Sequence, residues 1–280
     1  MTLILYEKAY AKINLFLWVG KKRGDGFHEI STYMRPVSLA DDIKLEIKSA
    51  VKTAIALTID GNPNVPSDQS NLVYKAAILF LDAFNKKARI NIALKKSIPT
   101  GAGLGGGSSD GAAILRALNR FYDFPFSEEE LTKMAAKLGS DVPFFISSKP
   151  ALCEGRGEKL TELHPTSAPY AVIVAGKEHS STAVAYRLLD EWKETNPLST
   201  VHFPNFENFT ANDVYNDFEA PISVACPSVK EHLAILKSFS PIACAMSGSG
   251  SAVFALFETE AEAIKAQSAF HDGAFVCKLL

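Results

Sequence analysis

The residue types best suited to chemistry are concentrated in one glycine-rich segment. Residues 97–113 read SIPTGAGLGGGSSDGAA, which places five glycines, two serines and one aspartate within residues 101–110. Glycines let the backbone turn sharply, and they let a phosphate approach main-chain N–H groups with no Cβ in the way. The start of a helix also attracts anions, because its first N–H groups are unpaired and its dipole is positive there. The segment therefore predicts a phosphate-binding loop and a helix that begins near Ser108, with Asp110 in its first turn.

Other glycine-rich motifs fit this segment less well. Gly101, Gly103 and Gly106 satisfy G-x-G-x-x-G, but a dinucleotide-binding fold needs a second strand after the helix, and the sequence instead predicts another helix at 127–139. A Walker A loop needs a lysine after its glycines, and none follows here. A plain turn without a ligand is disfavoured, because so many glycines sacrifice chain stiffness that such a turn would keep. A dinucleotide-dependent oxidoreductase is accordingly a weak alternative.

Alternating and helical patterns predict the elements that position this loop. Residues 90–94 alternate apolar and polar side chains and predict the strand that leads into it. In the helix predicted at 127–139, Ser127 and Glu130 form a capping box, and Gly139 suits the position after its last turn. Further strands are predicted at 43–49, 170–176 and 252–258, and further helices at 71–84 and 260–270. The mixture indicates an α+β chain of two domains, at 1–152 and 153–280.

The composition narrows the class of protein. The 280 residues are 47% hydrophobic and 21% charged, which is enough to bury a sizeable core. The 29 basic and 31 acidic residues nearly balance, so no basic surface for nucleic acid is expected. The four cysteines form no C-x-x-C pair, which argues against a zinc site or a disulfide framework. The N-terminal apolar run is broken by charged residues and resembles neither a signal peptide nor a membrane span, so a cytoplasmic globular protein is expected.

Three segments together resemble the motifs of the GHMP kinases, which phosphorylate small metabolites. They are YAKINLFLWVGKKRGDGFHEI (10–30), IPTGAGLGGGSSDGAA (98–113) and AMSGSGSAVFALF (245–257). The resemblance implies a two-domain α+β fold, with an N-terminal nucleotide-binding domain like the second domain of ribosomal protein S5 and a ferredoxin-like C-terminal domain. It also implies ATP as the phosphoryl donor, Mg²⁺, and a small-molecule substrate bound in a cleft between the domains.

Finer detail resembles one subfamily of these kinases. The segments RGDGFHE (23–29), LGSDVPFF (138–145) and NDFE (216–219) are similar to those of the enzymes that phosphorylate the 2-hydroxyl of 4-diphosphocytidyl-2-C-methyl-D-erythritol in the non-mevalonate isoprenoid pathway. The resemblance implies that Asp141 is the general base for the substrate hydroxyl. It implies that Lys12 lies near Asp141 and neutralises charge that develops during transfer.

The same resemblance assigns the binding residues. Phe27 and Tyr186 would stack on the two faces of the cytosine, His28 would bond its edge, and Asn14 would contact the substrate near the reacting end. By their position in the sequence, Asn71 and Lys96 are the candidates for contact with the adenine of ATP. The protein itself would hold no metal, because Mg²⁺ would arrive with ATP, within reach of Ser108 or Ser109. The ATP phosphates would be held by Pro99, Thr100, Gly101, Ala102, Gly103, Leu104, Gly105, Gly106, Gly107, Ser108 and Ser109.

Two alternatives of different kinds stay open at this point. The first is a GHMP kinase for homoserine, mevalonate or a sugar, but the DGFHE segment (25–29) argues against it, because those substrates carry no base on which an aromatic ring could stack. A non-catalytic nucleotide-binding relative is disfavoured because both Lys12 and Asp141 are present. For the oligomeric state, a monomer or a weak homodimer is expected, and no partner other than the small molecule.

Overall fold

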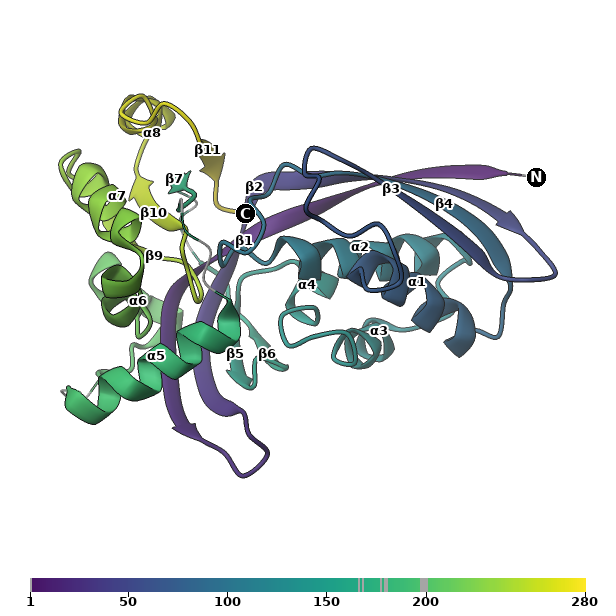
Figure 1. The fold of residues 1–280 in the computed structure, drawn as a ribbon, viewed down its shortest axis with the longest axis horizontal. Helices are drawn as coiled ribbons and strands as arrows, with labels where there is room; N and C mark the ends of the chain where they lie inside the picture. The colour runs from purple at the N-terminus through teal and green to yellow at the C-terminus, as the bar shows by residue number, and fades with distance from the viewer. Residues whose placement is uncertain (1, 166, 168, 177, 179–180, 197–200) are drawn as a thin grey trace. The chain divides into compact units, whose positions relative to one another are not determined.

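The computed structural model describes residues 2–165, 167, 169–176, 178, 181–196 and 201–280. These form two compact units that are interleaved along the chain (Figure 1). Unit 1 comprises Leu39–Thr100, Gly105–Ser148 and the chain up to Ala11; unit 2 comprises Lys12–Ser38, Gly101–Leu104 and Lys149–Leu280. The last change from one unit to the other thus falls between Ser148 and Lys149. The predicted domain boundary at 152/153 stays a prediction.

Unit 1 is a sheet with helices packed on one side of it (Figure 1). Its strands lie in the order β3, β4, β2, β1, where β1 and β2 are long strands that contribute residues to both units. β4 runs antiparallel to β2 and parallel to β3. The bounds are β1 Leu3–Lys22, β2 His28–Ser49, β3 Ala54–Asp60, α1 Leu72–Ala83, β4 Ala88–Lys95, α2 Gly106–Phe121, α3 Glu128–Ala135 and α4 Phe144–Ser147.

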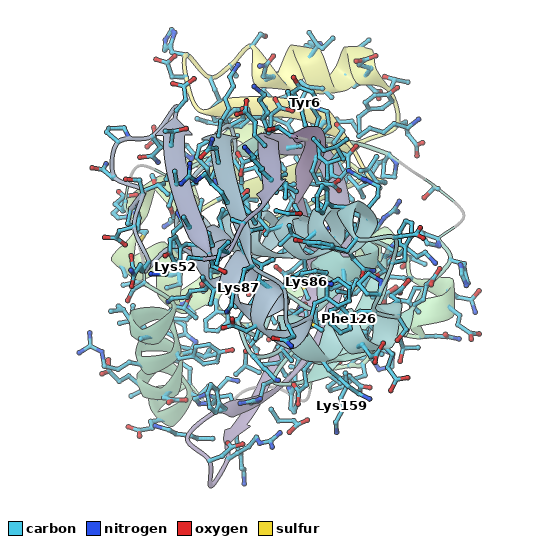
Figure 2. The ribbon with its side chains drawn as sticks, turned by 90° about the vertical axis from the view of Figure 1, so that its right-hand side faces the viewer. Tyr6, Lys52, Lys86, Lys87, Phe126 and Lys159 are labelled. Atoms are coloured by element: carbon cyan, nitrogen blue, oxygen red, sulfur yellow. The ribbon has the colours of Figure 1, made fainter. Side chains whose placement is uncertain are left out.

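The elements of unit 1 follow from their local sequences. In β4, Ile90, Ile92 and Leu94 are buried while the residues between them are exposed, as the alternation predicted. Helices α1 and α2 lie on one side of this sheet (Figure 1), and they pack against each other. Phe126, labelled in Figure 2, packs edge-to-face on Phe80 of α1 with ring centroids 5.3 Å apart. Such aromatic pairs contribute about 0.5–1.5 kcal/mol beyond their burial.

Helix α3 begins where the sequence predicted and ends earlier. The Ser127 hydroxyl accepts from the Glu130 N–H, and the Glu130 carboxylate accepts from the Ser127 N–H at 2.8 Å, which is the predicted capping box. The predicted end at Gly139 is wrong, because the helix ends at Ala135. The following turn is tightened by i→i+3 hydrogen bonds, such as that from Leu138 N–H to the Ala135 carbonyl at 2.9 Å.

Unit 2 contains an antiparallel four-stranded sheet in the order β11, β7, β10, β9. Helices α6 and α7 pack on each other, and α7 and α8 pack against strands of this sheet. In the same unit, β5 pairs with β2 and β6, and β8 pairs with β1. The bounds are β5 Ala151–Gly155, β6 Lys159–Glu162, β7 Tyr170–Val174, α5 Thr182–Thr195, β8 Tyr215–Asn216, α6 Glu219–Ala225, α7 Pro227–Lys237, β9 Ala243–Met246, β10 Val253–Phe257, α8 Glu260–Gln267 and β11 Ala274–Lys278, with 3₁₀ turns at Phe206–Asn208 and Ala211–Asp213.

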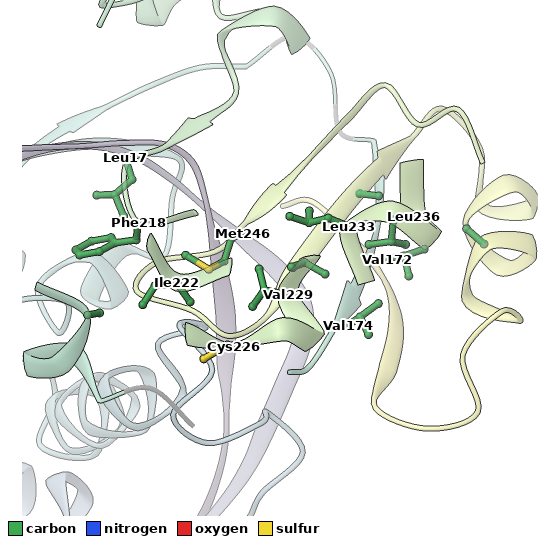
Figure 3. Packing of buried hydrophobic residues seen from close by; sticks show 14 of the residues in the cluster. Leu17, Val172, Val174, Phe218, Ile222, Cys226, Val229, Leu233, Leu236 and Met246 are labelled. Carbon is green, nitrogen blue, oxygen red and sulfur yellow. The ribbon is translucent and has the colours of Figure 1, made fainter. Parts of the chain in front are cut away.

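The core of unit 2 joins its sheet, its helices and the residues that β1 and β2 contribute. Figure 3 shows Leu17 of β1 near Phe218, and Met246 of β9 beside Ile222 of α6, all of them buried. Each such side chain stabilises the fold by about 1.5–3 kcal/mol through burial. The strands predicted at 170–176 and 252–258 are confirmed as β7 and β10, the central pair of this sheet.

Candidate active site

The glycine-rich segment folds as a loop that leads directly into α2. Gly101, Gly103 and Gly105 all have positive φ, between 69° and 79°, where a residue with a Cβ would be strained. Gly105 is the N-cap of α2, and none of the described side chains caps this helix. The helix therefore begins two residues before the predicted start at Ser108. Its first-turn N–H groups, from Gly106 onward, are available to an anion.

The first half of this loop, Gly101–Leu104, belongs to unit 2 and packs there against a second glycine loop, residues 247–252 between β9 and β10. A Cβ at Gly103 would lie 2.1 Å from the carbonyl oxygen of Ser247, so only glycine fits there. The Ser247 hydroxyl donates to the Gly103 carbonyl at 3.1 Å, and Ala252 N–H donates to the Ala102 carbonyl at 3.1 Å. Two motifs separated by more than a hundred residues thus form one backbone cradle.

Lys12 places a buried ammonium group beside this cradle. Its Nζ donates to the Gly103 carbonyl at 2.8 Å and to the side-chain oxygen of Asn14, and the residue is 3% exposed. Asn14 in turn donates to Thr32 at 2.7 Å, which fixes the amide. A Cβ at Gly248 would lie 3.2 Å from the Lys12 Nζ. Lys12 is therefore held as a positioned positive charge where the two glycine loops meet.

Asp141 lies in unit 1, half-buried in the turn between α3 and α4. The turn is held by hydrogen bonds from Val142 N–H to the Gly139 carbonyl and from Phe145 N–H to the Val142 carbonyl, at 3.3 and 3.1 Å. Lys12 lies in unit 2, so the pairing of Lys12 with Asp141 stays a prediction.

Lys96 and Asn71 have structural partners in unit 1. Lys96 is 9% exposed and donates to the carboxylates of Asp41 and Asp110. Its Nζ also lies 3.3 Å from where a Cβ of Gly106 would be, directly below the start of α2. Asn71 caps α1 by accepting from Val73 N–H at 2.9 Å. Their predicted contacts with adenine stay predictions.

Asp110 differs from its expected position. Because α2 begins at Gly106, Asp110 lies beyond the first turn, and it is buried beside Lys96 at 2.7 Å. Burial raises the pKa of the Asp110 carboxyl, and the neighbouring Lys96 ammonium lowers it. The effect of burial is the larger of the two, so the pKa is raised to about 7. Its Oδ1 is buried without a hydrogen-bond partner among the described residues.

The remaining loop residues differ in exposure. Thr100 is exposed and accepts from the Asn62 amide at 3.1 Å, and Pro99 before it is partly buried. Ser108 is partly exposed, whereas Ser109 is fully buried. Of the two serines, Ser108 is therefore the one accessible to solvent, and the predicted contact with Mg²⁺ stays a prediction. Among the described residues, no group of three or more His, Cys, Asp or Glu side chains is arranged to hold a metal ion.

The predicted base-binding residues lie together in unit 2. The ring of His28 stacks on that of Tyr186, with centroids 4.8 Å apart and an angle of 22° between the planes. Phe27 is 48% exposed, and the Arg156 guanidinium lies 4.7 Å from the centre of its ring. One aromatic ring is thus open to a planar ligand, while Tyr186 supports His28. Cytosine stacking between Phe27 and Tyr186 stays a prediction.

Several residues of these networks escaped sequence reasoning. Ser247 and Gly248 lie within a motif that the sequence displayed, but nothing local indicated that they meet Lys12. Asp41 and Asp190 each pair with a residue far away in the sequence, and neither stands in a recognisable motif. Only covariation with Lys96 or His28 would have signalled them.

One further concavity, of about 470 Å³, lies on the sheet of unit 1. Its lining includes Tyr6, which is 72% exposed and labelled in Figure 2, and Lys44 and Lys95 on the neighbouring strands. None of the residues that line it was predicted to bind ATP or substrate. No helix in the described part of the chain is both long and apolar enough to cross a membrane.

Comparison with known proteins agrees with the geometry. Residues 71–149 match the GHMP kinases N terminal domain, and residues 205–274 match the GHMP kinases C terminal domain. The 4-diphosphocytidyl-2-C-methyl-D-erythritol kinase of Methylacidiphilum infernorum is 44% identical over 259 residues, covering 90% of this chain and 86% of that protein.

Solved structures agree with this sequence match. A crystal structure of 4-(cytidine 5'-diphospho)-2C-methyl-D-erythritol kinase superposes with a TM-score of 0.80 at 32% identity, covering 98% of this chain and 99% of that one. Homoserine kinase from Cytophaga hutchinsonii has a TM-score of 0.73 at 18% identity, covering 100% and 94%, and it shares the fold alone. The predicted α+β GHMP kinase fold is confirmed, and the chain belongs to the 4-diphosphocytidyl-2-C-methyl-D-erythritol kinase family of the GHMP kinases.

Proposed function

We propose that this protein transfers the γ-phosphoryl group of ATP to the 2-hydroxyl of 4-diphosphocytidyl-2-C-methyl-D-erythritol, in the non-mevalonate isoprenoid pathway. The assignment of this substrate is supported by the membership of the chain in this kinase family. The single structural observation that carries the chemistry is the Lys12 ammonium, bonded at 2.8 Å to the Gly103 carbonyl inside the glycine loop. A fixed cation beside an N–H cradle is what phosphoryl transfer requires, because catalysis there is mainly alignment and charge neutralisation.

In this proposal the chain divides the reaction between two residues. Asp141 takes the proton of the substrate 2-hydroxyl as general base. Lys12 lowers the pKa of that hydroxyl and neutralises negative charge as the bond between the γ-phosphorus and the substrate oxygen forms and the bond to the leaving ADP oxygen breaks. Because Gly103 and Asn14 hold the ammonium in place, little reorganisation is needed during the step.

The N-terminal turn of α2 would hold the phosphates. The N–H groups of Gly106, Gly107 and Ser108 precede the first intrahelical hydrogen bond, which Ser109 N–H donates to the Gly105 carbonyl at 2.9 Å, and the glycines before them leave the approach open. Ser108, which is partly exposed, would hold Mg²⁺, and the ion would supply neutralisation of the phosphate charge.

The cytidine end of the substrate would bind in unit 2. Phe27 offers an exposed aromatic face, with Tyr186 as its partner in stacking, and His28 offers a hydrogen-bonding edge. Asn14 would contact the substrate near the reacting hydroxyl. For ATP, Asn71 and Lys96 would contribute from the adenine side, in addition to their structural bonds.

The proposal also includes the location, the oligomeric state and the partners of the enzyme. We place it in the cytoplasm as a monomer or weak homodimer that acts on a small molecule without nucleic acid. The near balance of 29 basic and 31 acidic residues supports the part of this proposal that excludes nucleic acid.

The deciding experiment is ADP release by the purified protein with ATP and Mg²⁺. Three acceptors are offered in parallel: the cytidylated methylerythritol, homoserine and mevalonate. Turnover with the first acceptor only is the expected result. Turnover with homoserine or mevalonate instead would contradict the substrate, and silence with all three despite ATP binding would contradict the kinase activity.

A further inference from the structure

His28 is held by two side chains of one helix in unit 2. Its Nε2 lies 2.9 Å from the Oδ1 of Asp190, and its ring stacks on Tyr186. Tyr186 and Asp190 are four residues apart on α5, so they lie on the same face of the helix. Stacking fixes the plane of the imidazole, and the hydrogen bond fixes its rotation within that plane.

The carboxylate of Asp190 also fixes which imidazole nitrogen carries the hydrogen. An ionised carboxylate can only accept, so the Nε2 of His28 must be the donor in this bond. In the neutral ring the other nitrogen, Nδ1, is then a bare acceptor. The His28 side chain is 6% exposed, so water competes little with this arrangement.

A bare acceptor distinguishes cytosine from uracil. At position 4 of the ring, cytosine carries an amino group that donates, whereas the corresponding pyrimidine with a carbonyl can only accept. An acceptor nitrogen aimed at this position therefore bonds cytosine and opposes uracil. Sites built in this way discriminate strongly, because the wrong ligand leaves buried polar groups unpaired.

We infer that Asp190 is a positioning residue that selects cytidylated over uridylated substrate, by holding His28 with its Nδ1 as the acceptor. This inference rests on the proposed function, since it concerns the base of that same substrate. The Asp190 side chain is 46% exposed, so the pair contributes little to stability. Its role is instead to set the donor and acceptor pattern of the base-binding pocket.

The tautomer is measured first, without substrate. Protein labelled with ¹⁵N-histidine is examined by long-range ¹H–¹⁵N NMR, and His28 is assigned among the six histidines by its loss in His28→Gln. The expected result is a protonated Nε2 and a bare Nδ1 for His28, with a shift toward the other tautomer in Asp190→Ala. A protonated Nδ1 in the unmodified protein would overturn the inference, whatever the substrate proves to be.

Base selection is then measured as the ratio of kcat/KM for the cytidylated substrate to that for its uridine counterpart. Asp190→Ala should lower this ratio about ten- to a hundredfold, mainly by raising KM for the cytidylated substrate and leaving kcat near its original value. Asp190→Asn keeps a carbonyl oxygen that can accept from Nε2, so it should restore most of the ratio. An unchanged ratio in Asp190→Ala would overturn the inference.

Glu191→Ala is the matched control, because it removes the same charge from an exposed neighbouring position on α5. It should leave the ratio unchanged, and an equal fall there would overturn the role assigned to Asp190. If the unmodified protein turns over neither nucleotide substrate, the proposed function fails, and the NMR result still decides whether Asp190 sets the tautomer.

Discussion

Lys96 and Asp41, 55 residues apart in the sequence, form an ion pair in which neither side chain is more than 5% exposed. Asp41 also accepts from the N–H groups of Ser97 and Ile98, the latter at 2.8 Å. Asp41, which lies in β2, thereby fixes the backbone of the residues between the end of β4 and the glycine loop. Within unit 1, this buried charge cluster thus holds both the chain that leads into the glycine loop and the first turns of α2, which contain Asp110.

Removing the cation from this cluster should strongly destabilise unit 1. Lys96→Met leaves the carboxylates of Asp41 and Asp110 buried without their partner, and such losses typically cost about 3–5 kcal/mol. Urea denaturation measures the free energy of unfolding. The control is Lys8→Met, whose ion pair with Asp42 is 59% and 55% exposed and should contribute at most about 1 kcal/mol. Equal losses in the two variants would contradict the role of burial.

The same cluster should make stability depend on pH. Burial raises the pKa of Asp110 to about 7, whereas an aspartate in the unfolded chain titrates near about 4. Between these values the native protein holds a proton that the unfolded chain has released. The contribution of Asp110 to the free energy of unfolding is therefore fully present below pH 4 and is lost as the pH rises to about 7.

Asp110→Asn isolates this contribution. The stability of the unmodified protein relative to the variant should fall between pH 5 and 7, by up to about 1.4 kcal/mol per pH unit, and then level off. Urea denaturation at intervals of half a pH unit gives the comparison. A relative stability that rises with pH would mean that the Lys96 ammonium outweighs burial and depresses the pKa.

The contrast between local and distant contacts explains what the sequence could predict. The Ser127–Glu130 capping box and the alternation in β4 depend on neighbours within a few residues, and both predictions are confirmed. The end of α3 was misplaced, because a glycine at 139 suits a helix end without requiring one. The turn bonds that stop the helix involve Met134 and Ala135, whose residue types carry no such signal.

The site shows the same division. The glycine loops and Lys12 stand in motifs, so their chemistry could be predicted before their positions were known. Asp41 and Asp190 could not be predicted, because each becomes meaningful only when the fold brings it to Lys96 or His28. Residues that position other side chains need not stand in a motif or at a characteristic spacing, so the sequence around them does not indicate their role.

Two glycines of the phosphate loop should respond differently to substitution by alanine. A Cβ at Gly107 meets nothing within 4 Å, and alanine favours helices by up to about 1 kcal/mol, so Gly107→Ala should fold at least as stably as the unmodified protein. The added methyl group would nevertheless crowd a phosphate at the first turn of α2. We expect KM for ATP to rise about tenfold, a transition-state loss of about 1.4 kcal/mol.

Gly103→Ala is the contrasting variant. At φ of +79°, with the Ser247 carbonyl 2.1 Å from the added Cβ, it should lose about 1–3 kcal/mol of stability or more. Steady-state kinetics and urea denaturation are measured on both variants. An unchanged KM for ATP in Gly107→Ala would move the phosphates away from this turn.

Replacing Lys12 should reduce turnover more than stability. Lys12→Met keeps an apolar stem of similar length in the buried site but removes the ammonium that bonds Gly103 and Asn14. We expect kcat to fall at least about a hundredfold, as for other lost electrostatic contacts in a transition state. The free energy of unfolding should fall by only about 1–3 kcal/mol, because the Gly103 carbonyl still accepts from the Ser247 hydroxyl at 3.1 Å. Turnover within a few-fold of the original would remove Lys12 from the reaction.

Asp141→Asn tests the general base directly. The amide has the shape of the carboxylate but cannot take a proton, so kcat should fall by about 10²–10⁴-fold. The Kd for ATP should stay near its original value, because Asp141 is assigned to the acceptor and not to the nucleotide. Glu129→Gln serves as the control, since that carboxylate is 78% exposed on α3 and pairs only with Lys133 among the described contacts. If Asp141→Asn turned over as fast as Glu129→Gln, the hydroxyl proton would have to leave by another group, and the half-buried position of Asp141 would then be a feature of the turn alone.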